Sequence, residues 1–372
     1  MKFTLPKSRF GTYLQYILQV VPTKSTLPIL TNILIEALEG KLKISATDLD
    51  ISITASMECD VSKKGSVALP ARILFDIVKE LPESDITVEA SGSRIELKVR
   101  GGRGSYKIAY ISPDDFPKLP AINTKKEIKI SGSDLRTMIQ HTTFACSDDE
   151  TRPALNGVLW QTKGDRMRMV ATDGHRLARI ALDNKMLKGL HEDVIIPPKV
   201  LNLIPRFVSD DAKEVGIIFG ENNIIFNLGD IVLTSRLIEG PYPNFEQVIP
   251  GENDKTLVVA KEDLLSAVRR VSILSNALTR QVKFSIQEGE LMLSTTNADV
   301  GGEAKERLEC DYKGDAIEIG YNANYVSDIL GKVESEDVVF ELSSNVSAGI
   351  VYGQNISKED YLCLIMPLRL AD

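Results

Sequence analysis

The pattern of apolar and polar residues repeats three times along this chain, at an interval of about 125 residues. Each copy has an apolar run, a turn with glycine, a second apolar run and a polar ending: NILIEALEGKLKISATDLD, GVLWQTKGDRMRMVATDGH and VKFSIQEGELMLSTTNADV. The turn glycines are Gly40, Gly164 and Gly289. Short alternating runs joined by a glycine turn predict a β-hairpin in each copy. The chain is therefore expected to contain one structural unit three times.

Two segments with helical spacing flank each predicted hairpin, because apolar residues recur there every three or four positions. The six predicted helices span residues 7–21, 68–82, 131–147, 197–210, 260–276 and 322–335. The expected buried faces are Phe10, Leu14, Ile17 and Val21; Ile73, Ile77 and Leu81; Leu135, Ile139, Thr142 and Cys146; Val200, Ile204 and Phe207; Leu264, Val268 and Val271; and Tyr325, Ile329 and Val333. Pro205 is expected to shorten or kink the fourth helix.

Further alternating runs follow the second helix of each copy, as in ITVEA with RIELKV. Each repeat is thus predicted to be an α+β unit of two helices packed on a mainly antiparallel sheet. Proline-containing stretches separate the copies and predict domains at residues 1–122, 123–252 and 253–372. Three copies of one unit are typical of an arc or a ring, although a scaffold whose copies differ in function gives the same pattern.

Composition places the chain among soluble globular proteins, with 43% hydrophobic and 26% charged residues. It contains no apolar run long enough to cross a membrane and no secretory signal, so a cytoplasmic protein is expected. Cysteines and histidines are too few and too scattered to predict a disulfide framework or a metal site. They are Cys59, Cys146, Cys310, Cys363, His141, His175 and His191.

The formal net charge is −8, which argues against a surface that wraps nucleic acid tightly. The charges are unevenly distributed, however. The six predicted helices carry 11 basic and 8 acidic residues, so they have an excess of three positive charges while the remainder is at −11. Two interpretations fit these numbers equally: helix faces of mixed charge that are exposed to solvent, or helices that face a polyanion.

The sharpest local motif is ATDGHRL, in which Asp173, His175 and Arg176 have the residue types of an acid, a base and an anion binder. The equivalent peptides in the other copies read ATDLDIS and STTNADV, which favours a structural turn. Asp48 and Asp50 form a carboxylate pair without a third ligand. The phosphate-binding glycine motifs are absent from the sequence, so no catalytic residue, metal or cofactor is expected.

The chain resembles the bacterial sliding clamps, the DNA polymerase III beta subunit family, over its full length. The motifs that carry the resemblance are MKFT, TLPIL, VALPARILFDIVKELP, DDFPKLP, LNGVLW, VATDGHRLA, IEGPYPNFEQVIP, ILSN, IEIGYNANYVSDIL and MPLRL, in this order. The resemblance implies a head-to-tail homodimer whose six domains form a ring, with helices lining the hole and sheets outside. It also implies a noncatalytic clamp that encircles double-stranded DNA and that an ATP-driven clamp loader opens.

The family also has an apolar cleft between the second and third domains that accepts short linear peptides. The resemblance implies as partners the replicative polymerase, the clamp loader, translesion polymerases, mismatch-repair proteins and DNA ligase. Thr279 and Gln247 stand where some relatives have an aromatic and a basic residue. The cleft positions that match are Leu155, Thr172, Gly174, His175, Arg176, Leu177, Pro243, Val248, Asn322, Tyr325, Val346, Ile365, Met366, Pro367, Leu368 and Arg369.

The resemblance further implies two sets of contacts outside the cleft. DNA-contacting positions are Lys24, Arg72, Arg152 and Lys199, whereas Pro153 and Ala154 replace aromatic residues found in some relatives. The dimer positions are Tyr106 of one subunit against Ile273 and Leu274 of the other, with Glu303 and Glu306 nearby; Ile73 replaces a lysine of relatives.

Two functions from other classes stay open at this point. One is an acid–base enzyme on a triplicated scaffold, with Asp173 and His175 as its reacting groups. The other is a protein-interaction scaffold that binds partners but is not retained on circular DNA.

Overall fold

The computed structural model describes residues 1–119, 127–184, 192–208, 214–298 and 301–370. The first expected domain boundary, between residues 122 and 123, lies outside these ranges, as do His191 and the end of the fourth predicted helix at residues 209–210.

The three predicted hairpins are confirmed. They are β2 (Asn32–Ala37) with β3 (Lys41–Thr47), β11 (Val158–Lys163) with β12 (Arg166–Thr172), and β19 (Gln281–Gln287) with β20 (Glu290–Asn297). The turn glycines Gly40, Gly164 and Gly289 have φ values of 66°, 66° and 72°. These values lie in the left-handed region, which glycine enters without a steric penalty.

An α-helix lies within each of the six predicted helical segments. The helices are α1 (Lys7–Ile17), α2 (Ala71–Glu80), α3 (Gly132–Gln140), α4 (Pro198–Leu201), α5 (Lys261–Ser272) and α6 (Ala323–Leu330). As expected from Pro205, the fourth is shortened, and a 3₁₀ turn at Ile204–Arg206 follows it. Among the described helices basic residues still outnumber acidic ones by three, nine against six.

The third helix ends earlier than predicted, at Gln140 rather than residue 147. The Thr142 hydroxyl donates a 2.7 Å hydrogen bond to the Met138 carbonyl, and a 3₁₀ turn follows at Thr143–Ala145. A threonine that bonds back to the preceding turn competes with the regular helical ladder. Cys146 consequently lies beyond the helix and is only half-buried.

The buried face predicted for the second helix is wrong in part. Ile73 is exposed and Ile77 is half-buried, whereas Ala71, Leu74 and Val78 face the core. The predicted and the observed set both have helical spacing. The exposed Ile73 made the sequence pattern ambiguous, because it is apolar but faces solvent. In the sixth helix Tyr325 is likewise half-buried.

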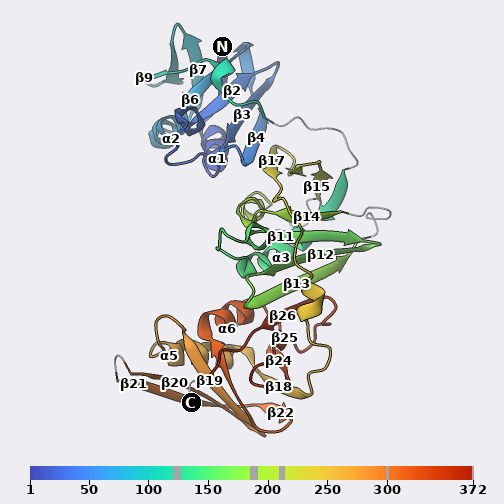
Figure 1. Ribbon diagram of the computed structural model, residues 1–372. Helices are drawn as coiled ribbons and strands as arrows, with labels where there is room; N and C mark the ends of the chain where they lie inside the picture. Colours follow the sequence, from blue (N-terminus) through green and yellow to red (C-terminus); the bar gives the residue numbers. More distant parts are fainter. Residues whose placement is uncertain (120–126, 185–191, 209–213, 299–300, 371–372) are drawn as a thin grey trace. The chain divides into compact units, whose positions relative to one another are not determined.

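The described strands form four sheets in which all pairs are antiparallel. The five-stranded sheet has the order β5-β1-β7-β8-β9 and the four-stranded sheet the order β21-β20-β19-β23. Their further strands are β1 (Lys2–Pro6), β5 (Asp60–Lys63), β7 (Asp85–Ser91), β8 (Arg94–Val99), β9 (Ser105–Ala109), β21 (Gly302–Glu309) and β23 (Ile317–Asn322). Figure 1 shows α5 and α6 on one side of β19, β20 and β21.

The two larger sheets each contain strands from two repeats. The eight-stranded order is β10-β15-β16-β17-β4-β3-β2-β6, and the nine-stranded order is β14-β11-β12-β13-β26-β25-β24-β18-β22. The repeats join where β4 pairs with β17 and where β13 pairs with β26. The further strands are β4 (Ile51–Glu58), β6 (Gly65–Pro70), β10 (Ile128–Ser131), β13 (Arg176–Asp183), β14 (Asp193–Ile196), β15 (Glu214–Phe219), β16 (Asn223–Asn227), β17 (Ile231–Arg236), β18 (Lys255–Ala260), β22 (Asp311–Lys313), β24 (Asp337–Leu342), β25 (Gly349–Gly353) and β26 (Tyr361–Ile365).

The chain divides into two compact units, because the second repeat shares one sheet with each neighbour. One unit is Met1–Leu135 with Lys199–Leu237, and the other is Arg136–Pro198 with Ile238–Asp372. Each has its own apolar core, with Phe3, Phe10 and Phe226 fully buried in the first and Trp160 and Phe284 in the second. None of the helices in the described ranges is long and apolar enough to span a membrane.

Candidate functional site

The turn between β12 and β13 is held by the side chains at its start. Thr172 Oγ1 donates to the Arg176 carbonyl at 2.6 Å, and Asp173 Oδ1 accepts from the backbone N–H groups of His175 and Arg176 at 2.8 and 2.9 Å. Aspartate and threonine at a tight turn satisfy backbone N–H and carbonyl groups in this way. Gly174 completes the turn with a φ of 92°. The fixed turn leaves the His175 side chain exposed.

Arg176 is buried and its guanidinium is fully occupied by internal contacts. It donates to Asp173 Oδ2 at 3.2 Å, to Asp328 Oδ2 at 2.5 Å and to the Phe144 carbonyl at 2.7 Å. Its charged carbon lies 4.5 Å from the centre of the Tyr325 ring, a cation–π distance. Arg176 therefore connects the turn to α6 and to the segment after α3, and it stabilises the site rather than presenting a free cation.

Strand β26 and the residues after it form the opposite wall of the site. Arg176 is paired with Ile365 in the sheet, and the Met366 N–H then donates to the His175 carbonyl at 2.8 Å. The Leu368 N–H donates to the Gly320 carbonyl, also at 2.8 Å. These bonds fix the backbone of Pro367 and Leu368, which are half-buried, and they leave Met366 exposed.

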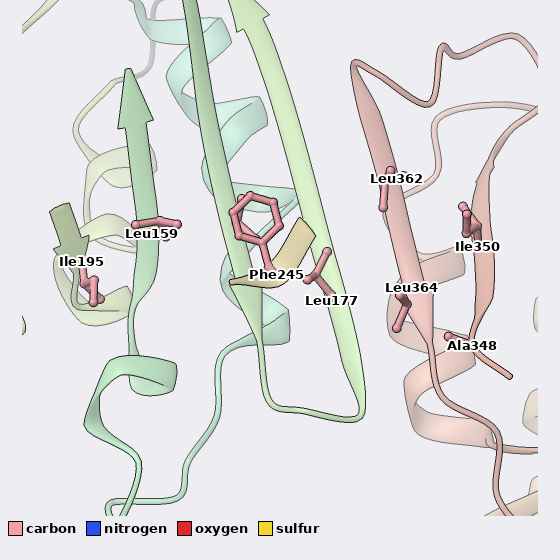
Figure 2. Close-up of a cluster of buried hydrophobic side chains, with 9 residues drawn as sticks. Leu159, Leu177, Ile195, Phe245, Ala348, Ile350, Leu362 and Leu364 are labelled. Carbon is pink, nitrogen blue, oxygen red and sulfur yellow. The ribbon is translucent and has the colours of Figure 1, made fainter. Parts of the chain in front are cut away.

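Residues 240–249, here called the strap segment, pack on one face of the nine-stranded sheet. Phe245 is buried in an apolar cluster of the second unit (Figure 2), and Arg168 Nη1 donates to Glu246 Oε1 at 3.0 Å. Figure 2 shows the Phe245 ring between Leu159 and Leu177, which lie on two strands to either side of it. The cluster contains Leu159, Val170, Leu177, Ile195, Phe245, Ala348, Ile350, Leu362 and Leu364. Phe245 and Glu246 thus anchor the strap segment that carries Pro243 and Val248.

Three exposed apolar side chains flank this buried cluster. Val248 follows Phe245 and is 55% exposed, Val346 precedes Ala348 and is 64% exposed, and Met366 follows Leu364 and is 37% exposed. Large apolar side chains left in water beside an apolar cluster mark an interaction surface. A methionine among them provides an adaptable contact, because its unbranched chain fits different partners.

The remaining cleft residues predicted from the sequence all lie in the same unit. Leu155 is buried, and Asn322 Oδ1 accepts from the Asn324 N–H at 2.9 Å, so it caps α6. The rings of His175 and Tyr325 are stacked with centroids 6.3 Å apart. Arg369 is exposed, and its carbonyl accepts from Gln281 Nε2 at 2.9 Å.

One thiol and two phenol groups near the site stay neutral over a wide pH range. Burial raises the pKa of the Cys146 thiol to about 12 and raises the pKa of the Tyr242 hydroxyl well above its ordinary value. Burial is also the main cause of the raised pKa of Tyr325. These neutral groups and the exposed apolar side chains suit the side chains of a short peptide.

The acid–base interpretation of ATDGHRL is not supported by this geometry. Both oxygens of Asp173 accept hydrogen bonds from the turn and from Arg176, whereas His175 stacks on Tyr325. Asp48 plays the same structural role in the first repeat, where it accepts from the N–H groups of Asp50 and Ile51. Within the described ranges, no group of histidine, cysteine and acidic side chains could hold a metal ion.

The four DNA-contacting positions predicted from the sequence are exposed. Lys24 lies in the loop after α1 and Arg72 on the first turn of α2. Arg152 forms a 2.8 Å ion pair with Asp149, and Lys199 is paired with Asp48. Both pairs are accessible to solvent on one side and are weak enough to exchange for other anions.

The expected dimer residues lie on two open sheet edges and directly after helix α5. Tyr106 is on β9 and is exposed, and Glu303 and Glu306 are on β21, the edge of the four-stranded sheet. Ile273 follows α5 and is 75% exposed, while Leu274 is half-buried. Within the described residues of one chain, β9 and β21 each have only one neighbouring strand.

The sequence did not reveal several residues that shape the site. Asp328 and Phe144 hold Arg176, and Arg168 holds the strap segment through Glu246. The spacing of apolar residues cannot identify such pairs, because the partners are far apart in the chain. The aromatic Phe245 within the proline-containing stretch PYPNFEQVIP was the one available signal of a buried anchor.

Three family models cover almost the whole chain. They describe the DNA polymerase III beta subunit: its N-terminal domain matches residues 1–120, its central domain 129–244 and its C-terminal domain 246–369. The beta sliding clamp of Pseudomonas aeruginosa is 33% identical over 371 residues, and that of Chlamydia muridarum is 32% identical over 372 residues. Each alignment covers 100% of both chains.

Solved structures give the same result. A DnaN sliding clamp from Pseudomonas aeruginosa bound to griselimycin matches with a TM-score of 0.94 at 32% identity. The DNA polymerase sliding clamp from Bacillus subtilis matches with a TM-score of 0.95 at 27% identity. Both matches cover 100% of this chain and of the other.

Proposed function

This chain belongs to the DNA polymerase III beta subunit family, and from this premise we propose that it is a DNA sliding clamp that encircles duplex DNA and tethers the replicative polymerase. We further propose three clamp domains at residues 1–122, 123–252 and 253–372, in agreement with the three matched segments. The clamp itself is noncatalytic. It acts in the cytoplasm, on the DNA of the nucleoid.

The observation that carries the tethering role is the exposed apolar rim beside the buried cluster. Val248, Val346 and Met366 come from three separate segments and are exposed beside buried members of that cluster. A peptide with leucine and phenylalanine side chains would cover this rim and gain the free energy of apolar burial. Through the same surface the clamp would bind the polymerase catalytic subunit, the clamp loader, translesion polymerases, mismatch-repair proteins and DNA ligase in turn.

The ring is supported by the two open sheet edges. Within the chain, β4–β17 and β13–β26 each join two repeats into one sheet of eight or nine strands. Pairing β9 of one subunit with β21 of the next would join the five- and four-stranded sheets in the same manner. It would also cover edges that otherwise invite aggregation. Tyr106, Ile273 and Leu274 would be the apolar part of this contact in a head-to-tail homodimer.

The charge pattern fits a clamp that slides along DNA rather than a protein that binds DNA tightly. The helices carry an excess of three positive charges in a chain of net charge −8. A closed ring is retained by its topology, so few phosphate contacts are needed and their number sets the salt dependence of binding. Lys24, Arg72, Arg152 and Lys199 would supply such contacts. Residues 153–154 are Pro and Ala and are not included among them.

The tethering role is tested by the anisotropy of a labelled Gln-Leu-Ser-Leu-Phe peptide added to the full-length protein. We expect saturable binding in the micromolar range, which corresponds to about −8 kcal/mol. Deletion of residues 368–372 should abolish it, because Leu368 is then lost from the wall of the cleft. Circular dichroism checks that the truncated protein is folded. A folded wild-type protein that does not bind the peptide would contradict the assignment of this cleft.

A further inference from the structure

The first repeat contains a turn with the same hydrogen bonds as the turn at the peptide cleft. Thr47 Oγ1 donates to the Ile51 carbonyl at 3.0 Å, as Thr172 Oγ1 does to Arg176. Asp48 Oδ1 accepts from the N–H groups of Asp50 and Ile51 at 3.1 and 2.7 Å, as Asp173 does from His175 and Arg176. The internal repeat has therefore produced a second copy of the scaffold on which the cleft is built.

The neighbouring strand is also equivalent. In the cleft, β13 pairs with β26 and sets Leu177 opposite Leu364. In the first repeat, β4 pairs with β17 and sets Ser52 opposite Thr234. Both hydroxyl residues are buried. The same cross-strand position thus carries two leucines in the peptide cleft and two hydroxyl residues in the first repeat.

A cavity of about 260 Å³ lies at this second scaffold, within the first unit. Its lining includes Leu49, Ser52, Lys118, Asn223, Thr234 and Arg236. The Ser52 hydroxyl donates to Thr47 Oγ1 at 2.9 Å, so its oxygen is free to accept. Polar groups thus replace the apolar floor of the peptide cleft, and a ligand here must offer polar contacts.

Leu49 lines this cavity in a strained conformation. It has a φ of 82° and is 48% exposed, whereas the equivalent residue of the peptide cleft is Gly174 with a φ of 92°. A bulky non-glycine residue in the left-handed region is a conformational outlier. Such residues persist at binding sites, where the strain is offset elsewhere. An exposed leucine held in this way offers one apolar contact beside the hydroxyl floor.

The charges at the cavity favour an acidic ligand. Lys118 is exposed and forms no ion pair within the described part of the chain. Arg236 lies 4.0 Å from Asp50, and both side chains are more than 70% exposed, so this pair is weak. Asp50 also lines the cavity, which thus presents two cations against one carboxylate in a protein of net charge −8. Acidic side chains would be attracted here and repelled by most of the remaining surface.

We propose that this cavity, between the β3–β4 turn and strands β16 and β17, binds a second short peptide that is acidic and carries one apolar side chain. The peptide carboxylates pair with Lys118 and Arg236, and its apolar side chain lies on Leu49. Its main-chain N–H groups donate to the oxygens of Ser52 and Thr234. The two clefts together would let one clamp bind two segments of a partner whose chemistries differ.

The test is a methyl NMR titration of the full-length protein with the peptide acetyl-Glu-Asp-Leu-Asp-Glu-amide. The methyl groups of Leu49 and Leu177 report on the second cavity and on the peptide cleft respectively. We expect saturable shifts at Leu49 and none at Leu177. The uncharged peptide acetyl-Gln-Asn-Leu-Asn-Gln-amide should give no shift at Leu49. Absence of a shift at Leu49, or shifts at Leu177 alone, would overturn the proposal.

Variants separate the cavity from general electrostatic attraction. The double substitution Lys118→Ala with Arg236→Ala should weaken the acidic peptide by about tenfold, whereas Lys41→Ala, which removes an exposed lysine elsewhere on the same unit, should not. Leu49→Gly should raise the melting temperature of the protein and lower its affinity for the acidic peptide. Unchanged affinity of the double variant would overturn the proposal. So would a short DNA duplex that displaces the peptide from Leu49, because the cations would then be phosphate contacts.

Discussion

At the residue scale, the turn motifs show how far the sequence alone can lead. Gly40, Gly164 and Gly289 could be predicted as turn residues, because only glycine enters the left-handed region freely. Two roles stayed open for Asp173 from the sequence, a turn residue or a member of a reacting pair, although the equivalent peptides of the other repeats favoured the turn. The structure shows that its carboxylate holds the turn and Arg176.

The contacts of Arg176 predict a large effect on stability. In Arg176→Ala, the Asp173 carboxylate, whose side chain is 13% exposed, and the Phe144 carbonyl lose their guanidinium partner. Breaking a buried charge pair on one side costs about 3–5 kcal/mol of unfolding free energy. Arg307→Ala is the matched control, because Arg307 forms an exposed pair with Glu290 that is worth at most about 1 kcal/mol. Urea denaturation measures both, and equal losses would contradict the structural role of Arg176.

The thiol of Cys363 predicts a pH dependence of stability. Burial raises its pKa to about 12, so between about pH 8.5 and pH 12 the unfolded chain loses a proton that the folded chain keeps. The free energy of unfolding therefore falls by about 1.4 kcal/mol per pH unit in this window from this group. Cys363→Ala lacks this contribution. Its stability deficit against the wild type should shrink by about 2 kcal/mol between pH 8 and pH 10, because the effect begins near the ordinary thiol pKa of about 8.5. A deficit that does not change with pH would show that Cys363 ionises equally in both states.

At the element scale, periodicity predicted the hairpins and the positions of the helices, but it did not fix their ends or faces. Helix α3 ends early because Thr142 bonds back to Met138. In α2 the exposed Ile73 belongs to an apolar set that matches helical spacing as well as the buried one does. The strap segment has no periodicity, so its anchoring by Phe245 could not be derived from the pattern.

The strap segment provides a prediction about peptide affinity. Arg168→Gln removes the ion pair with Glu246 at 3.0 Å and loosens the segment that carries Pro243 and Val248. We expect about threefold weaker binding of the Gln-Leu-Ser-Leu-Phe peptide, since an ion pair of this exposure contributes less than about 1 kcal/mol. Arg307→Gln, which also removes a partly exposed ion pair, should leave the affinity unchanged. Equal affinities of the two variants would show that the ion pair does not position the cleft.

At the scale of the whole molecule, the internal repeat was the most informative feature of the sequence. It predicted three equivalent α+β units, and the family models match three successive segments. The sequence could not show that β4–β17 and β13–β26 join the repeats into continuous sheets, because strand pairing between distant segments leaves no local pattern. Within the described residues, the open edges β9 and β21 belong to the two smaller sheets and support the proposed dimer.

Two substitutions should separate the dimer contact from the peptide cleft. Ile273→Asp places a charge on the exposed residue after α5, and we expect it to weaken the dimer at least tenfold while the peptide still binds. Val346→Asp places a charge on the rim of the cleft. It should lower the affinity for the peptide while the dimer persists. The cost of burying an unpaired charge at an interface is about 2–5 kcal/mol. Analytical ultracentrifugation and peptide anisotropy measure the two properties, and a reversed outcome would exchange the roles of these surfaces.

The central claim is that the protein is retained on DNA by encircling it. The most direct measurement loads labelled protein onto nicked circular DNA with a clamp loader and ATP, and then isolates the complex in high salt before and after a single cut linearises the DNA. The account predicts stable retention on the closed circle, no retention without the loader, and rapid loss once the circle is cut. Equal retention on circular and linear DNA would show that the protein binds the DNA surface, and the clamp assignment would be wrong.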